Sequence, residues 1–261
     1  MAVDRRKFLK AAGLTALAAA GKPLTVLAQD DSAVVEKAGL AQENPLTGKR
    51  WAMVIDLKKC SDHENIKDCA TACHRVHNVP HFDNPKDEIK WIWDESFEHA
   101  FHEQEHEHVA EDLKHLELPV LCNHCDNPPC VRVCPTQATW RREEDGIVMM
   151  DWHRCIGCRY CIVACPYGSR SFNWRDPRPF IEEIQPDFPT RTRGVVEKCT
   201  FCEERLAVGK LPACVEASKN GALVFGDLED PDSEVRELLR TRFSIRRKSG
   251  LGTNPEVYYL V

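Results

Sequence analysis

Fourteen cysteines, most of them in tight groups, constrain this 261-residue chain more than any other feature of its sequence. An even number of cysteines can indicate disulfides in a secreted protein. Here only two or three residues separate many neighbouring cysteines, and such spacing suits ligands that converge on one metal centre. Two groups are complete, and each ends in a Cys-Pro pair, at Cys134-Pro135 and at Cys165-Pro166. The chain is therefore predicted to fold around metal sites.

The two complete groups predict two neighbouring 4Fe–4S clusters. The group from Cys155 to Cys165 has the C-x2-C-x2-C-x3-C-P spacing of bacterial two-cluster ferredoxins. In that pattern three thiolates hold one cluster and the fourth cysteine binds the other cluster. The predicted ligands of one cluster are Cys122, Cys125, Cys130 and Cys165, and those of the next are Cys155, Cys158, Cys161 and Cys134. Structural zinc is the alternative, because C-x2-C pairs also bind zinc.

Two further groups lack one cysteine each. One consists of Cys199, Cys202 and Cys214, with Ser218 at the place of a fourth cysteine, and the other consists of Cys60, Cys69 and Cys73, with His63 at the x2 spacing after Cys60. The same exchange of ligands makes Cys73 the fourth ligand of the first of these groups, which predicts a third 4Fe–4S cluster. The remaining side chains mark a vestigial fourth site, namely Cys60, Cys69, His63 and Ser218.

Two thiolates are a poor cage for a cubane, and a serine hydroxyl is a weaker iron ligand than a thiolate. We therefore expect Cys60 and Cys69 either as free thiols or as a disulfide. Histidine, moreover, is known as a ligand mainly of two-iron centres. The competing interpretation is a fourth cluster with unusual ligands. The sequence thus predicts three clusters and leaves the fourth site open.

The N-terminal segment has the features of an export signal. Arg5, Arg6 and Lys7 precede an alanine-rich apolar run, and Ala28 offers a small residue for cleavage. A basic head with a short apolar stretch is typical of a signal peptide, and the paired arginines resemble the twin-arginine type. This predicts a signal peptide over residues 1–28 and export to the periplasm or the outer face of the membrane. The alternative is an amphipathic helix that packs on the protein.

Composition excludes two other classes. The formal net charge is −6, which argues against a nucleic-acid-binding protein. The sequence has no run of about eighteen apolar residues, so it predicts no membrane-spanning helix. It also has no phosphate loop, dinucleotide fingerprint or nucleophile motif. We therefore predict neither an enzyme acting alone nor a direct small-molecule substrate.

Strand patterns between the cysteine groups predict an α+β fold of duplicated ferredoxin-like units. Residues 50–57 form an apolar strand pattern, and Asp145-Gly146 between two short strand patterns is a hairpin signal. The predicted parts are an outer unit of residues 50–80 with 195–225, a middle two-cluster unit of residues 118–180, and a C-terminal extension of residues 226–261. The extension is expected to contain a helix capped by Asp232 or Ser233, with Val235, Leu238 and Leu239 inside, and a strand at 256–261.

Residues 91–117 form an acidic, histidine-rich insert. It has nine acidic residues, one lysine and five histidines, which are His99, His102, His106, His108 and His115. The first three histidines recur at i, i+3 and i+7, which favours one face of a solvated acidic helix. A second metal site or a docking face for a redox partner is the alternative. A single histidine inside a cysteine group, His124, is expected to act as a hydrogen-bonding neighbour of the cluster rather than as a ligand.

The order of the four groups resembles one known family, the iron–sulfur electron-transfer subunits of DMSO reductase and polysulfide reductase complexes. The resemblance covers residues 50–261 and includes Pro212-Ala213-Cys214 and the segment 251–255. Residues 122–130, residues 171–179 and Ser218 resemble, within that family, the exported iron–sulfur subunits of DsrMKJOP complexes.

This resemblance implies a function and its partners. It implies one-electron relay between 4Fe–4S clusters and a quinone-interacting membrane subunit of the NrfD type, with the middle unit nearest the membrane. It also implies an exported multihaem cytochrome c and the other DsrMKJOP subunits as partners. Two alternatives are an iron–sulfur subunit of a molybdopterin-dependent reductase for sulfur or arsenic oxyanions and a structural module stapled by zinc.

Overall fold

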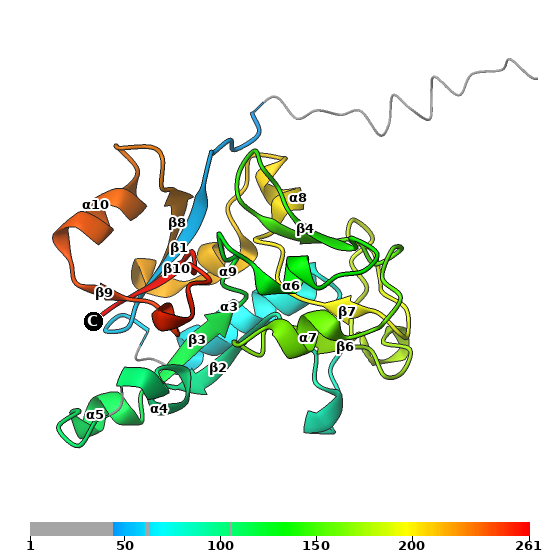
Figure 1. The fold of residues 1–261 in the computed structure, drawn as a ribbon, viewed down its shortest axis with the longest axis horizontal. Helices are drawn as coiled ribbons and strands as arrows, with labels where there is room; N and C mark the ends of the chain where they lie inside the picture. The colour runs from blue at the N-terminus through cyan, green and yellow to red at the C-terminus, as the bar shows by residue number, and fades with distance from the viewer. Residues whose placement is uncertain (1–43, 61–62, 105) are drawn as a thin grey trace, which may run out of the picture. The chain divides into compact units, whose positions relative to one another are not determined.

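The structure is a computed structural model that describes residues 44–60, 63–104 and 106–261. The predicted signal peptide, residues 1–28, lies outside the described residues. A four-stranded sheet with the order β8-β1-β10-β9 joins distant parts of the chain (Figure 1). β1 (Trp51–Asp56) pairs antiparallel with β8 (Leu223–Asp227) and parallel with β10 (Val257–Leu260). β9 (Ser244–Ile245) pairs antiparallel with β10.

Both faces of this sheet are covered, as the burial of every residue of β1 shows. Met53 and Ile55 point into the large core, whereas Ala52 and Val54 pack on the opposite side with Val235 of α10 (Glu234–Thr241). On the large-core side, α3 (His63–Val76) packs against α9 (Ala213–Ala217). Successive strand residues point to opposite faces, so a strand buried throughout has apolar residues on both faces. The one charged residue of β1, Asp56, pairs with Arg242.

The C-terminal extension forms the predicted helix and strand. Val235 is fully buried, and Leu238 and Leu239 are partly buried against the same small core. Ser233 occupies the N-cap position, but its side chain makes no capping hydrogen bond, so the predicted cap is wrong in that respect. Its hydroxyl lies over Gly226 of β8, where an added Cβ would come within 2.7 Å of it.

The insert of residues 91–117 is not the predicted continuous helix. β2 (Ile92–Ser96) pairs antiparallel with β3 (Glu117–Leu121), and between them lie α4 (Phe97–Ala100), a 3₁₀ turn at His102–Gln104 and α5 (Glu111–Lys114). The apolar residues decide this outcome, because burial of the aromatic side chains in the large core outweighs the helical spacing of the histidines. Among the described residues, no histidine of the insert belongs to a group of three side chains that could hold a metal ion.

Two short antiparallel pairs frame the middle of the chain. β4 (Thr139–Arg141) and β5 (Val148–Met150) form the predicted hairpin, and its turn has Gly146 at φ +79°. β6 (Ser171–Phe172) pairs with β7 (Val196–Glu197). The connections contain the short helices α6 (Pro129–Arg132), α7 (Tyr160–Ala164) and α8 (Glu203–Leu206). Further 3₁₀ turns span Pro85–Asp87, Arg178–Phe180, Lys219–Gly221 and Ser249–Leu251. Within the described residues, no helix is long and apolar enough to cross a membrane.

Candidate metal centres

The first predicted ligand set lines one small cavity. Its four members are Cys122, Cys125, Cys130 and Cys165. Cys122 directly follows β3, Cys130 lies in α6, and Cys165 is the C-cap of α7, so three separate elements deliver three of the sulfurs. Burial raises the pKa of the Cys125 thiol to about 12, and the neighbouring Cys122 adds to this rise. We call these four residues the first set.

The second predicted set lines another cavity nearer the surface. Its members are Cys134, Cys155, Cys158 and Cys161, and the first three are only half-buried. The backbone N–H of Ala138 donates a hydrogen bond to Cys134 Sγ at 3.2 Å. Burial opposes ionisation of Cys134, but hydrogen bonds, led by one from the backbone of Thr139, lower its pKa. We call these four residues the second set.

The third predicted set joins two ends of the chain. Its members are Cys73, Cys199, Cys202 and Cys214, all of them buried. Burial raises the pKa of Cys73 well above its ordinary value, and the other three sulfurs add to the rise, which shows that the four side chains are neighbours. Cys73 comes from α3, Cys214 from α9, and Cys202 is the N-cap of α8. We call these residues the third set.

The fourth site contains only two cysteines, Cys60 and Cys69. Burial raises the pKa of Cys60 to about 12 with a contribution from Cys69, and burial raises that of Cys69 to about 11. The Ser218 side chain opposes this rise at Cys69, and both cysteines are free thiols in this structure. Cys60, Cys69 and Ser218 therefore lie together. His63 begins α3, but its side chain is outside the described part of the structure.

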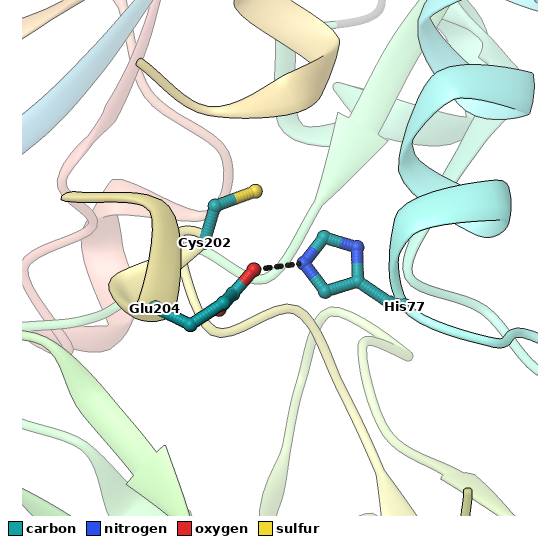
Figure 2. Close-up of side chains that lie close together, drawn as sticks. All are labelled: His77, Cys202 and Glu204. Carbon is teal, nitrogen blue, oxygen red and sulfur yellow. Dashed lines mark hydrogen bonds and ion pairs between the residues drawn. The ribbon is translucent and has the colours of Figure 1, made fainter. Parts of the chain in front are cut away.

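Two side chains beside the third set were missed by sequence reasoning. Figure 2 shows His77 and Glu204 next to Cys202, with His77 Nε2 3.0 Å from Glu204 Oε1. The other ring nitrogen of His77 lies 2.7 Å from the Cys73 carbonyl oxygen and 3.5 Å from Cys73 Sγ. The available signal was position: His77 is one helical turn after Cys73, and Glu204 follows Cys202 by two residues. Because Cys202 belongs to the third set, we treat His77 and Glu204 as residues that support the side chains of that set.

His124 is predicted to be a hydrogen-bonding neighbour of a cluster, and in the structure it bonds to the backbone of β5. Its Nδ1 accepts a hydrogen bond from the Val148 N–H at 3.1 Å, and its ring stacks on Phe201 with a centroid distance of 3.7 Å. Burial lowers its pKa well below the ordinary value, helped by the charge of Lys198. His124 is therefore a neutral packing residue between cysteine groups.

Two buried cations lie close to the cysteine sulfurs, and sequence reasoning missed both. Arg170 Nη2 donates to Cys130 Sγ at 3.0 Å. Lys198 Nζ donates to the Cys199 carbonyl oxygen at 2.5 Å and to the Val148 carbonyl oxygen. Burial alone would lower the pKa of Arg170, but the neighbouring cysteine sulfurs, Cys130 first, raise it above its ordinary value.

The donor chemistry of the three sets fits metal clusters. Each set offers four sulfurs, and the ligand of an iron–sulfur cluster is the thiolate. Burial makes thiolates costly where no metal is bound, as the raised pKa values of Cys73 and Cys125 show. A bound metal reverses this balance, since its positive charge deprotonates a coordinating thiol. The residues present therefore fit tetrathiolate metal centres.

Comparison with known proteins identifies the kind of centre. The family model described as "4Fe-4S dicluster domain" matches residues 113–178, which contain the first two sets. The chain is 41% identical to an Hdr-like menaquinol oxidoreductase iron–sulfur subunit 1 of Archaeoglobus fulgidus, over 98% of this chain and 97% of that protein. It is 38% identical to the iron–sulfur cluster-binding subunit of a menaquinone reductase of Nitratidesulfovibrio vulgaris, over 81% and 88%. It is 34% identical to the iron–sulfur subunit of an arsenate respiratory reductase of a Shewanella species, over 81% and 96%.

Proposed function

We propose that this chain, which belongs to the family of iron–sulfur electron-transfer subunits of menaquinol oxidoreductase and related reductase complexes, relays electrons between a quinone-interacting membrane subunit of the NrfD type and a redox partner. As a member of this family, the chain is an electron-transfer subunit rather than a catalytic one, and it binds 4Fe–4S clusters. The observation that carries the proposal is the convergence of twelve cysteines in three sets of four.

We assign one cluster to each set. The four cysteines of the first set, Cys122, Cys125, Cys130 and Cys165, would hold one cluster. The second set would hold another through Cys134, Cys155, Cys158 and Cys161. The third set would hold a third cluster through Cys73, Cys199, Cys202 and Cys214. Such clusters supply one-electron chemistry when bound. The protein holds the sulfurs in place, excludes water from the buried sets and supplies hydrogen bonds to sulfur, such as that from Ala138 to Cys134.

The sets support a relay with the first set in the middle. Burial raises the pKa of Cys199 in the third set, and the sulfur of Cys122 in the first set adds to this rise. Burial likewise raises the pKa of Cys161 in the second set, although Arg170 lowers it. The sulfur of Cys130 in the first set adds to the rise. Such influences act between neighbouring groups, so the first set adjoins both others.

An apolar surface beside the second set supports docking of the membrane subunit there. The exposed fractions of Ile156, Tyr160 and Val163 are 66%, 61% and 87%. Ile156 and Tyr160 flank Cys158 in sequence, and Val163 lies in α7. Exposed apolar side chains grouped in this way mark interaction sites, and half-buried Cys155 and Cys158 bring the second set close to this surface. Electrons would enter or leave the relay here.

The finer identity that we propose is DsrO, the exported iron–sulfur subunit of DsrMKJOP complexes. It rests on residues 122–130, residues 171–179 and Ser218, which resemble that subunit. The partner at the third-set end would then be an exported multihaem cytochrome c, with the other Dsr subunits in the same complex. The paired Arg5 and Arg6 support export by the twin-arginine route to the outer side of the cytoplasmic membrane.

The alternative is the iron–sulfur subunit of a molybdopterin-dependent reductase for sulfur or arsenic oxyanions. The relative from an arsenate respiratory reductase favours it. The incomplete fourth site counts against it, because the resemblance to the family implies that this site is the end of the relay that meets a molybdenum subunit.

Purification under anaerobic conditions tests the proposal. The full chain should be brown and carry about twelve iron atoms and as much sulfide, at four of each per cluster. A colourless zinc protein would overturn the relay. Membranes solubilised in mild detergent should yield an NrfD-type subunit and a multihaem cytochrome with this chain, whereas a molybdopterin subunit in their place would support the alternative. Replacement of both Arg5 and Arg6 by lysine should leave the protein in the cytoplasm.

A further inference from the structure

Arg170 is a buried cation whose hydrogen-bond partners are unusual. The exposed fraction of Arg170 is 4%. Its Nη2 donates to Cys130 Sγ at 3.0 Å and to Thr139 Oγ1 at 2.9 Å, and its Nη1 lies 3.8 Å from Met150 Sδ. A guanidinium stays protonated in proteins, so Arg170 brings a fixed positive charge to the sulfurs of the first set.

A second buried arginine, Arg191, has a carboxylate as its partner, which is the ordinary partner of a buried guanidinium. Arg191 is equally inaccessible, and its Nη2 lies 2.6 Å from a carboxylate oxygen of Glu197. Among the described residues, Arg170 forms no ion pair with any carboxylate. An uncompensated buried charge is strongly unfavourable, so the counter-charge of Arg170 has to come from the thiolates around it. These are Cys130 first, then Cys161, Cys122 and Cys165, of which three belong to the first set.

The third set has charges of both signs beside it. A carboxylate oxygen of Glu204 lies within 4.8 Å of Cys202 Sγ, and the same carboxylate bonds to His77 Nε2 at 3.0 Å. Lys198 Nζ donates to the carbonyl oxygen of Cys199, which is a member of that set. Arg170 differs from Lys198 because its guanidinium bonds to a cysteine sulfur itself rather than to carbonyl oxygens.

We propose that Arg170 raises the midpoint potential of the first set. Reduction adds one negative charge to a cluster, and a cation in contact with a ligand sulfur favours the reduced form. This inference rests on the proposed ligand sets.

The test is a redox titration of the anaerobically purified full chain, followed by electron paramagnetic resonance. Cys125→Ser should alter or remove one signal that Cys73→Ser leaves unchanged, and this signal is assigned to the first set. Arg170→Gln should lower the midpoint potential of this signal by at least a tenfold change in the one-electron equilibrium, which is about 59 mV. Arg170→Lys keeps the charge and should lower it less. Arg178→Gln is the matched control, because Arg178 is exposed and bonds to Asp176.

One result would overturn the inference while the proposed function stands, namely an unchanged midpoint potential of the first-set signal in Arg170→Gln with full iron content. If Arg170→Gln does not load iron, Arg170→Lys decides, because a first-set potential equal to or above that of the wild-type protein overturns the inference. A wild-type chain without iron contradicts the proposed function itself, so the two failures are distinct.

Discussion

The Ser218 hydroxyl oxygen accepts a hydrogen bond from the Leu223 N–H at 3.1 Å, and the Ser218 side chain also opposes the rise that burial causes in the pKa of Cys69. Leu223 begins β8, so Ser218 satisfies a backbone donor where the sheet starts. The residue at the place of a missing cysteine therefore has a structural role of its own. This explains how the fourth site can lose a ligand while the fold around it is kept.

Ser218→Ala should leave the iron content unchanged and lower the stability. Loss of the acceptor leaves the Leu223 N–H without its partner, which costs about 1 kcal/mol in the free energy of unfolding. Iron analysis and urea unfolding measure the two effects. Loss of about four iron atoms would instead make Ser218 a ligand of a fourth cluster.

Cys73→Ser should remove one cluster, and Cys60→Ser should remove none. Both cysteines are buried, and both belong to the first cysteine group of the chain, so the second variant is a matched control. Under our assignment Cys73 completes the third set, whereas Cys60 belongs to the fourth site. The measurement is iron and sulfide per chain, with an expected loss of about four irons for Cys73→Ser. Full iron content in Cys73→Ser would show that the pairing of the two incomplete groups is wrong.

The thiols of the fourth site should make the protein less stable at alkaline pH. Burial raises the pKa of Cys60 to about 12 and that of Cys69 to about 11, whereas an unfolded cysteine has a pKa of about 8.5. The folded protein keeps these protons when the unfolded chain loses them. The contribution of these two thiols to the free energy of unfolding is therefore full below about pH 8.5. Above that pH it falls by about 1.4 kcal/mol per pH unit for each thiol, until the pH passes the pKa of the thiol in the folded protein.

Urea midpoints between pH 8 and 10, followed by tryptophan emission, measure this slope. The wild-type midpoint should fall more steeply with pH than that of a variant in which both Cys60 and Cys69 are alanine. Parallel slopes would mean that the two cysteines are not protonated thiols but are bound to metal or joined as a disulfide.

Gly157→Ala should disturb the second set. Gly157 lies between Cys155 and Cys158 at φ +70°, and an added Cβ would come within 2.4 Å of the Gly194 carbonyl oxygen. Strain of this kind costs roughly 1–3 kcal/mol. We expect a lower urea midpoint and loss of the second cluster before the others on exposure to air. Gly250→Ala is the control, because nothing lies within 4 Å of its added Cβ, and an equal effect of both variants would contradict the prediction.

Several features could be predicted from the sequence because they depend on residues close together in the chain. The x2 and x3 spacings bring sulfurs to one point through short loops, and the structure gathers the predicted cysteines around the cavities of the first and second sets. Asp145-Gly146 predicts a tight turn because glycine tolerates the positive φ found there. The family itself follows from the order of these local motifs.

Tertiary structure alone decided the fold of the insert, the positions of the charged side chains around the sulfurs, and the contact of His77 with Glu204 beside the third set. The helical spacing of His99, His102 and His106 had no influence, because burial of neighbouring aromatic residues in the large core selects a strand pair. Arg170 is forty residues from Cys130 in sequence, and Glu204 is 127 residues from His77. Electrostatic contacts depend on distance in space, and no spacing rule connects single charges so far apart along the chain.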